Sequence, residues 1–250
     1  MHAPAQMPRI VTYNVHRCVG NDRRLDVARV ADVLAKLEPD IVALQELDVG
    51  RARTGGVDQA HEIARRLDMA CHFNAALTVE EEKYGDAILT TFPERLVKVG
   101  PLPGHPAIRA LEPRGALWIE VEIGEARVQV INTHLGLVPK EQQIQATFLS
   151  GPAWLGHPQC KGPTILLGDF NATATSVVYR TFVKGLSPAR ALAKVKTPTA
   201  TFPSALPVLR IDHLFVSPEI RVADVFAPFA PITRVASDHL PLVMDFEVAG

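Results

Sequence analysis

The sequence has few cysteines, and those it has do not form a pattern. Its 250 residues include Cys18, Cys71 and Cys160, an odd number spread widely and without a Cys-x-x-Cys spacing. Disulfide frameworks use even sets of cysteines, and thiolate zinc sites use paired ones. We therefore expect free thiols and a reducing, cytoplasmic location.

Long apolar runs and a targeting segment are also missing. Residues 1–8 carry neither a basic start nor an apolar stretch, and no later stretch approaches the roughly 18 uninterrupted apolar residues of a membrane span. We expect neither export nor stable membrane insertion. Residues 1–7 are predicted to be a flexible N-terminus.

The chain has no marked excess of charge of either sign. Its 26 basic and 27 acidic side chains leave a net charge of −1, so no global positive field collects nucleic acid from solution. A few cations in a cleft could still hold a substrate phosphate. With 47% hydrophobic and 21% charged residues, the composition is that of a soluble protein with a packed core.

Several common catalytic signatures are absent. The sequence contains no Gly-x-Ser-x-Gly elbow, P-loop or dinucleotide-binding glycine fingerprint. His61 and Glu62 begin like the helix of a zinc protease, but Arg65 stands where the second metal-binding histidine is needed. These absences argue against a serine hydrolase, a nucleotide triphosphatase, an oxidoreductase and a zinc protease.

Strand-like and helical patterns alternate along the chain. Short apolar or alternating runs predict strands, and three- and four-residue apolar spacing predicts helices. The predicted strands are residues 9–15, 41–44, 71–76, 86–91, 96–99, 114–123, 127–133, 164–167, 211–216 and 240–248, and the predicted helices are 26–37, 59–67 and 140–149. Residues 101–113 and 188–207 are rich in proline and are predicted to be irregular connections.

Strand–helix units in this order are mixed with a hairpin over residues 114–133. The mixture favours an α/β fold of two packed, mainly antiparallel or mixed β-sheets flanked by helices over a single parallel sheet. We found no internal repeat or linker that divides the chain, and we predict one domain over residues 1–250.

Polar side chains recur where the apolar strands begin or end. One such residue is commonly a turn residue or a helix cap, but a recurring set is harder to explain in that way. Magnesium prefers oxygen ligands from one or two carboxylates, and phosphoester hydrolysis also needs an acceptor for water and donors for the phosphoryl oxygens. The set consists of Asn14, Glu46, His134, Asp169, Asn171, Asp212, Asp238 and His239.

Seven short segments carry a resemblance that covers essentially the whole chain. They are Thr12-Tyr13-Asn14-Val15-His16, Leu44-Gln45-Glu46, Tyr84-Gly85-Asp86-Ala87-Ile88-Leu89, Asn132-Thr133-His134-Leu135, Gly168-Asp169-Phe170-Asn171, Arg210-Ile211-Asp212-His213 and Ser237-Asp238-His239. In this order the sequence resembles the endonuclease/exonuclease/phosphatase superfamily. That superfamily includes DNase I, apurinic endonucleases, inositol polyphosphate phosphatases and neutral sphingomyelinases.

The resemblance implies a four-layer α/β sandwich like that of DNase I and a requirement for Mg²⁺, with Mn²⁺ able to substitute. It implies that Glu46 is the principal metal carboxylate and that Asn14 and Asp238 complete the metal shell directly or through water. Whether one metal ion acts or two is left open.

The resemblance also implies catalytic roles for the remaining members of the set. Asp169 would orient or deprotonate the attacking water, and Asn171 and His239 would hold the scissile phosphate. His134 would donate to the developing charge or the leaving group. Asp212 would orient a histidine, for which His239 is the preferred partner, because a carboxylate beside an imidazole fixes its tautomer and favours its charged form.

Four further residues are weaker candidates for binding the substrate phosphate. Arg51, Arg53 and Arg114 have the planar donor fork that suits oxyanions, although ordinary surface solvation explains such arginines equally well. Tyr84 belongs to a segment that lies near the phosphate in the superfamily. Asp86 belongs to the same segment, and an alternative interpretation is that it caps a strand.

The residues thus predict a hydrolase that cleaves a phosphodiester or phosphomonoester with a metal-assisted water and without a covalent intermediate. The near-neutral charge favours a small or lipid-derived phosphoester over nucleic acid, and we infer no obligate protein partner. Two alternatives stay open: a DNA or RNA endonuclease or exonuclease of the same superfamily, and a noncatalytic phosphoester-binding protein on the same scaffold.

Overall fold

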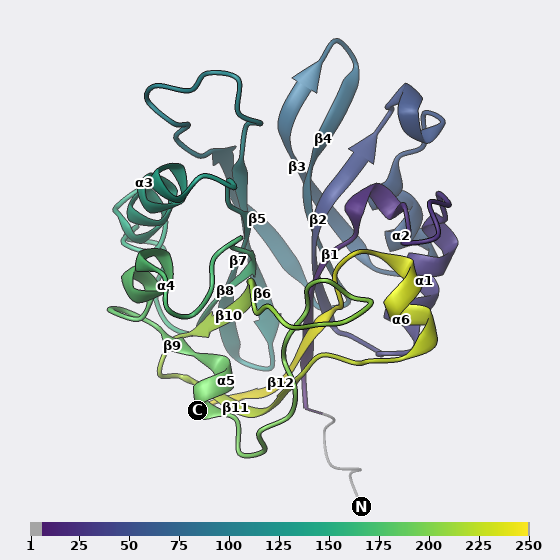
Figure 1. Ribbon diagram of the computed structural model, residues 1–250. Coiled ribbons are helices and arrows are strands. Elements are labelled where there is room, and N and C mark those ends of the chain that lie inside the picture. Colours follow the sequence, from purple (N-terminus) through teal and green to yellow (C-terminus); the bar gives the residue numbers. More distant parts are fainter. Residues whose placement is uncertain (1–6, 250) are drawn as a thin grey trace, which may run out of the picture.

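Two β-sheets packed face to face form the centre of the molecule (Figure 1). The computed structural model describes residues 7–249. In spatial order, the first sheet contains β11 (Ile220–Phe226), β12 (Leu242–Val248), β1 (Arg9–Asn14), β2 (Ile41–Val49), β4 (Glu82–Thr90) and β3 (Ala70–Val79). The second contains β5 (Glu94–Pro101), β6 (Gly115–Ile123), β7 (Ala126–His134), β8 (Thr164–Asp169), β10 (Asp212–Val216) and β9 (Ser187–Pro188).

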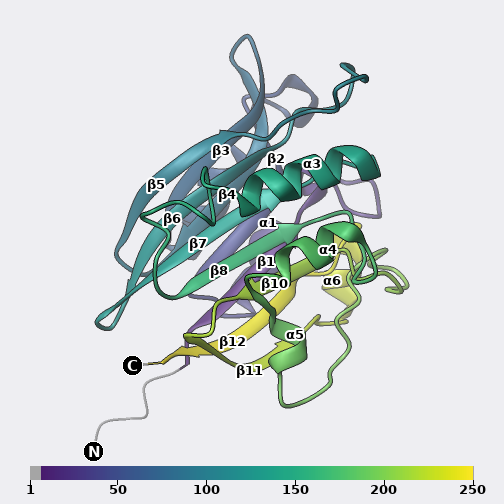
Figure 2. The same ribbon diagram turned by 90° about the vertical axis from the view of Figure 1, so that its left-hand side faces the viewer.

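Helices cover the outer faces of both sheets. On the side of the first sheet lie α1 (Val27–Ala35), α2 (Gln59–Leu67) and α6 (Pro231–Ala236), and on the side of the second lie α3 (Pro139–Ser150) and α4 (Val177–Phe182). The short α5 (Ala189–Leu192) packs against β10 and β11 at the edge of the sandwich (Figure 2). Two 3₁₀ turns, η1 (His16–Cys18) and η2 (Ala52–Thr54), follow β1 and β2.

The predicted fold of two mixed, mainly antiparallel sheets flanked by helices is confirmed. Neighbouring strands run antiparallel except for the pairs β1–β2 and β7–β8, which are parallel. The predicted flexible N-terminus falls outside the described residues apart from Met7, which is exposed. No helix within residues 7–249 combines the length and the apolarity that a membrane crossing requires.

The core is divided into three layers of buried apolar side chains, and β2 explains why. Ile41 and Ala43 point into the cluster between the sheets, whereas Val42 and Leu44 point into the cluster beneath α1 and α2. A strand whose two faces are both buried is expected to be a continuous apolar run, as this one is. A third cluster lies between the second sheet and the helices α3 and α4.

Local sequence signals account for the helix boundaries. The carboxylate of Asp26 accepts a hydrogen bond from the Arg29 N–H at 2.9 Å, and that of Asp58 accepts one from the His61 N–H at 3.0 Å. Each carboxylate satisfies an amide at the start of a helix that has no partner within the helix. The predicted helices at residues 26–37, 59–67 and 140–149 and the predicted hairpin are therefore found in nearly the expected places.

Other sequence expectations were incomplete. The segments that became β11, α4 and α6 were not predicted, because each is short and its apolar pattern spans at most two turns or a few alternations. The irregular connection predicted at residues 188–207 is mostly irregular but contains α5. The hairpin of β3 and β4 extends well beyond its apolar positions, because backbone pairing continues where the side chains are exposed.

One prediction about β2 was wrong in a way that bears on function. Glu46 was expected at the end of a strand, but β2 continues to Val49 through a β-bulge. Leu44 pairs with Ala87 and Leu47 with Gly85, so two residues of β2 stand opposite one residue of β4. Glu46 adopts a positive φ of 62° at this point. The bulge breaks the ladder and redirects the Glu46 side chain.

Buried amides repair the interrupted ladder. Asn132, on β7 of the opposite sheet, donates from Nδ2 to the carbonyl oxygens of Leu44 and Ala87, each at 2.9 Å. Its Oδ1 accepts from Gln45 Nε2 at 2.8 Å, and Gln45 also donates to the Thr12 hydroxyl at 3.0 Å. Asn132, Gln45 and Thr12 are completely buried. We call this group the amide clamp, because it ties the two sheets together at the bulge.

Replacing Asn132 with leucine tests the clamp. Asn132→Leu keeps a side chain of similar size but removes the side-chain donor to two buried carbonyls and one of the acceptors of Gln45. The free energy of unfolding should fall by roughly 2 to 5 kcal/mol, because each unsatisfied buried group costs about 1 to 3 kcal/mol. Urea denaturation measures this difference. Gln159→Leu removes an exposed amide and should leave stability nearly unchanged, whereas equal effects of both changes would contradict the clamp.

Candidate active site

The polar residues predicted from the sequence meet where several strands begin or end. His134 ends β7 and pairs in register with Asp169, which ends the parallel neighbour β8. Asp212 begins the antiparallel strand β10 opposite Asp169. Asn14 ends β1 in the other sheet. Because the carboxyl ends of β7 and β8 lie at the same edge, their last side chains share one end of the sandwich with the start of β10.

A glycine makes the close approach of β7 and β8 possible. Gly168, directly before Asp169, has a φ of 142°, and a Cβ atom there would lie 1.8 Å from the carbonyl oxygen of Thr133. Any side chain at this position would force the two strands apart. Gly168 thus lets the end of β8 place Asp169 beside His134.

Asp169 lies at the centre of the site and links both sheets. Its Oδ2 atom accepts a hydrogen bond from Asn14 Nδ2 at 3.0 Å and lies 3.6 Å from Nε2 of both His134 and His239. Its Oδ1 atom accepts from the backbone N–H of Asn171 at 2.8 Å. Burial and the nearby charge of Asp212 raise the pKa of Asp169 to about 7, against the lowering effects of the imidazolium of His239 and these hydrogen bonds.

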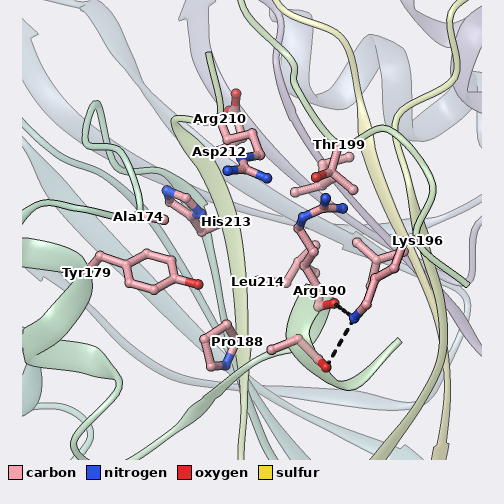
Figure 3. A pocket seen from close by; sticks show the side chains of 13 residues that line it. Ala174, Tyr179, Pro188, Arg190, Lys196, Thr199, Arg210, Asp212, His213 and Leu214 are labelled. Carbon is pink, nitrogen blue, oxygen red and sulfur yellow. Dashed lines mark hydrogen bonds between the residues drawn. The ribbon is translucent and has the colours of Figure 1, made fainter. Parts of the chain in front are cut away.

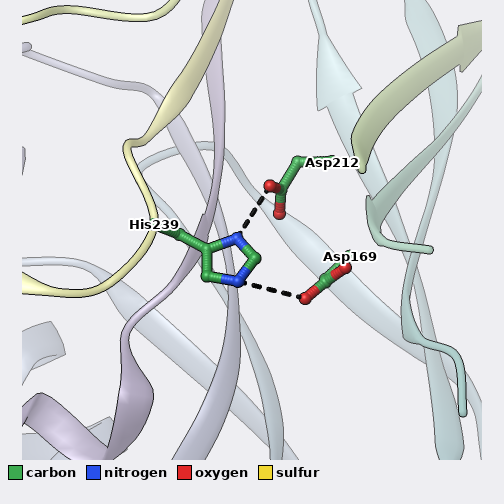
Figure 4. Close-up of side chains that lie close together, drawn as sticks. All are labelled: Asp169, Asp212 and His239. Carbon is green, nitrogen blue, oxygen red and sulfur yellow. Dashed lines mark hydrogen bonds and ion pairs between the residues drawn. The ribbon is translucent and has the colours of Figure 1, made fainter. Parts of the chain in front are cut away.

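His239 is held between two carboxylates (Figure 4). Its Nδ1 donates to Asp212 Oδ2 at 2.8 Å, while its Nε2 faces Asp169. Burial alone would lower the pKa of His239, but the charge and hydrogen bond of Asp212, together with Asp169 and Asp238, raise it to about 10. His239 is therefore an imidazolium at neutral pH. The preferred pair of Asp212 and His239 is in contact, and the orienting role of Asp212 stays a prediction.

His134 has the opposite protonation behaviour. Its ring nitrogens lie 3.1 Å from Arg114 Nη1 and 3.1 Å from Asn171 Nδ2. Burial, followed by the positive charges of Arg114 and His239, lowers the pKa of His134 well below its ordinary value. His134 is therefore neutral at neutral pH. Two histidines in one site with different charges can perform different tasks.

The predicted metal ligands form an oxygen-rich group beside Asp169. Asn14 Nδ2 lies 3.1 Å from Glu46 Oε1, and the Ser237 hydroxyl, which donates to the Asn14 carbonyl at 2.8 Å, connects this strand end to Asp238. Glu46 and Asp238 are both half-buried, so their carboxylates remain accessible. The carboxylates of Glu46 and Asp238 suit Mg²⁺ better than a soft metal. The Asn14 amide donates to Glu46 through its nitrogen, and its oxygen accepts from the His16 N–H at 3.0 Å.

A tighter acidic group lies next to these residues. Within residues 7–249, three potential ligands with atoms no more than 4.8 Å apart are Asp169, Asp212 and His239. Both ring nitrogens of His239 already face carboxylates, and a protonated imidazole cannot ligate a metal. We therefore place the candidate metal position at Glu46, Asn14 and Asp238 and treat the tighter group as a chain of hydrogen-bonded acid and base.

The weaker phosphate-binding candidates are arranged unequally. Arg53 forms a double hydrogen bond with Asp48 at 2.7 and 2.6 Å and lies over the ring of Tyr84 at 5.5 Å, while Arg51 pairs with Glu82 at 3.3 Å. Arg114 pairs with Glu112 at 2.8 Å and also contacts the site directly through His134. A phosphate-binding role of these four residues stays a prediction.

Sequence reasoning undervalued Asp86. It does not cap a strand but lies within β4, opposite the bulge, and is almost fully buried. Burial raises the pKa of its carboxyl to about 8, although the charge of Arg114 and a hydrogen bond from the Glu46 backbone oppose the rise. A carboxylate directly before the apolar run Ala87-Ile88-Leu89 was the signal that could have identified it.

The loop after α5 supplies site residues that no local pattern indicated. The hydroxyl of Thr201 donates to Asp212 Oδ2, the oxygen that also accepts from His239. The ring of Phe202 packs against that of His239, with centroids 4.9 Å apart. Both residues fix the orientation of the Asp212–His239 pair.

Comparison with known proteins shows the family of the chain. The model of the Endonuclease/Exonuclease/phosphatase family matches residues 11–239. The chain belongs to this family. The Uncharacterized protein YbhP of Escherichia coli strain K12 is 26% identical over 94% of each chain.

Solved structures share the fold. An endonuclease/exonuclease/phosphatase from Beutenbergia cavernae superimposes with a TM-score of 0.78 at 23% identity, covering 98% of this family member and 72% of the other chain. The mannosyl-6-phosphatase Bt3783 of Bacteroides thetaiotaomicron gives a TM-score of 0.73 at 21% identity over 96% and 99% of the two chains. At this level of identity the likeness establishes the fold alone.

The charge of His239 can be measured directly. In the metal-free protein, NMR should show the ring of His239 protonated until the pH approaches about 10. Asp212→Asn should lower that pKa, because the largest raising contribution is lost while burial continues to favour the neutral ring. Asp32→Asn on the exposed face of α1 is the matched control. A His239 that titrates identically in wild type and Asp212→Asn would contradict this account.

Proposed function

We propose that this family member is a divalent-metal-dependent phosphoesterase that uses Mg²⁺, with Mn²⁺ as a substitute, and hydrolyses a phosphodiester or phosphomonoester with water as the nucleophile. The observation that carries the proposal is the position of Asp169 Oδ2, which lies within 3.6 Å of Asn14, His134 and His239 at the junction of the two sheets. This places a proton acceptor next to amide and imidazole donors and beside an oxygen-rich metal position.

The candidate metal ligands and Asp169 would have different roles in the reaction. Glu46, Asn14 and Asp238 would hold a divalent cation, which when bound supplies positive charge that neutralises phosphoryl oxygens. Asp169 would orient the attacking water and accept its proton. A buried acceptor held by Asn14 and the Asn171 backbone keeps a fixed position relative to a bound phosphate.

The two histidines would act on the phosphate in different ways. His239, charged and oriented by Asp212, would contact a nonbridging oxygen, where a fixed positive group stabilises the transition state. His134 is neutral and lies beside Asn171, so it would donate its single N–H toward the developing charge or the leaving group.

A direct hydrolysis without a covalent intermediate fits the surrounding side chains. The hydroxyl of Ser237, which directly precedes Asp238, donates to the Asn14 carbonyl and is buried. It is therefore committed to holding the strand end and is poorly placed to attack a substrate. Water positioned by Asp169 is the nucleophile that the arrangement favours.

The charges around the site favour a compact substrate. Arg51 and Arg53 are paired with Glu82 and Asp48, so much of their positive charge is already neutralised. With a net charge of −1, the chain has little capacity to displace counterions along a polynucleotide. We therefore favour a small or lipid-derived phosphoester over a nucleic acid.

Substitutions at the two central carboxylates test the proposal. Glu46→Gln and Asp169→Asn should each lower turnover of the best substrate by about 30- to 1000-fold, equivalent to roughly 2 to 4 kcal/mol in the barrier. Glu46→Gln should also weaken Mg²⁺ binding in calorimetry, whereas Asp169→Asn should retain it. The control is Glu62→Gln on the exposed side of α2. Full activity in both variants would exclude the proposed site.

Metal removal and salt dependence distinguish the proposed phosphoesterase from a nuclease and from a noncatalytic binding protein. Treatment with EDTA should abolish hydrolysis, and Mg²⁺ should restore it, in a panel of DNA, RNA, phosphoinositides, sphingomyelin and simple phosphoesters. A compact substrate should give a weak dependence of KM on salt, whereas a nuclease should lose affinity steeply as salt rises. Tight phosphoester binding without turnover of any of these compounds would instead support a binding protein.

A further inference from the structure

A cavity lies beside Asp212 at the edge of the sandwich (Figure 3). Its volume is about 280 Å³, far above the roughly 10 to 15 Å³ of free volume that one water needs. It opens at the edge of the sandwich among β10, α4, α5 and the loop that follows α5. Space of this size can accept a small molecule.

Basic side chains surround this cavity. Arg190 and Arg210 reach into it from different elements, and the hydroxyl of Tyr179 points toward it (Figure 3). Burial raises the pKa of Tyr179, while the charges of Arg210 and Arg190 oppose the rise, which reflects how close the three groups are. Among the described residues that line the cavity, the one carboxylate is that of Asp212.

Two of the side chains are already fixed by the protein. Arg190 donates from Nη1 to the carbonyl of Thr197 at 2.9 Å, which holds its guanidinium in place. Lys196 donates to the carbonyls of Arg190, Ala191 and Ala193 at 3.2 to 3.3 Å and thereby fixes the end of α5. The wall that carries Arg190 is therefore preorganised.

Two residues that line the cavity carry buried oxygen atoms without partners. The hydroxyl of Thr199 and the Oδ1 atom of Asp212 have no hydrogen-bond partner within residues 7–249, although these residues are only 4% and 2% exposed. Buried polar atoms are nearly always hydrogen-bonded, and leaving one unpaired is unfavourable. The arrangement therefore calls for an occupant with polar groups of its own.

We propose that this cavity binds a small hydroxylated molecule that carries an oxyanion, either phosphate or carboxylate. Arg190 and Arg210 contact the oxyanion, for which the guanidinium fork is well suited. Hydroxyl groups of the ligand pair with Thr199 Oγ1 and donate to Asp212 Oδ1. The cavity is distinct from the candidate catalytic centre, because Asp212 is the one member of that centre among the described residues that line it.

The three tyrosines of the chain allow the two sites to be observed separately. Tyr179 lines the cavity, Tyr84 lies close to Glu46 in the candidate catalytic centre, and Tyr13 lies in the core. In protein labelled with ¹³C on the tyrosine rings, inorganic phosphate and acetate are titrated separately in metal-free buffer. Binding in the cavity should shift the Tyr179 signals saturably, with a Kd of about 1 mM or tighter.

Variants decide whether the shift reports the proposed contacts. Arg190→Ala combined with Arg210→Ala should weaken the Tyr179 response about tenfold or more, whereas Arg127→Ala, which removes a side chain that is 69% exposed, should not change it. A response to phosphate but not acetate, or the reverse, identifies the oxyanion. Absence of a saturable Tyr179 shift with both anions would overturn the proposal, as would an unchanged response in the double variant.

A conservative substitution tests the same cavity without risking the loss of the fold. Thr199→Val keeps the shape of the side chain and removes only the unpaired hydroxyl, so the ligand-free protein should be at least as stable as wild type. The hydroxyl should matter for a hydroxylated oxyanion such as glycerol 3-phosphate, whose Kd should rise several-fold in Thr199→Val. Equal affinities for glycerol 3-phosphate in Thr199→Val and wild type would show that the hydroxyl has no part in binding.

Discussion

The bulge in β2 is the constraint on which the site depends. A regular antiparallel ladder would send consecutive side chains to opposite faces and would leave Glu46 within the packed layers. The extra residue interrupts the ladder, and the amide clamp supplies donors to the carbonyls of Leu44 and Ala87 that the interruption leaves behind. Because the clamp belongs to the opposite sheet, the packing of the two sheets and the orientation of Glu46 are coupled.

The same sheet-to-sheet contact sets the electrostatics of the site. Asn14 from the first sheet and Asp169 from the second meet at 3.0 Å, in an environment where burial raises the pKa of the Asp169 carboxyl. Burial also lowers the pKa of His134, but at His239 the carboxylates of Asp212 and Asp169 outweigh it. One buried pocket thus contains a neutral and a charged histidine, and the difference arises from which charges lie next to each ring.

Asp212 connects the candidate catalytic centre to the proposed oxyanion-binding cavity. One carboxylate oxygen accepts from His239 and Thr201, and the residue also lines the basic cavity with Arg190 and Arg210. A ligand in that cavity would touch the residue that orients His239 without entering the proposed catalytic centre. The loop after α5 contributes to both sites, through Thr201 on one side and Thr199 on the other.

The sequence by itself determined the fold class, the main helices and the residues that meet at the strand ends. Those features rest on local physics: apolar periodicity marks the buried faces, Asp26 and Asp58 cap helices, and polar residues directly after β7 and β8 share one edge. The pairing of Asp212 with His239 was also inferred in advance and is present at 2.8 Å.

Only the tertiary structure decided the bulge at Glu46, the buried position of Asp86, the pairing of Arg51 and Arg53 with carboxylates, and the cavity behind Asp212. Each depends on how residues distant in the sequence pack together. A strand register is set by its partners, and a cavity is set by the elements that fail to fill it, so neither leaves a periodic signal in the chain.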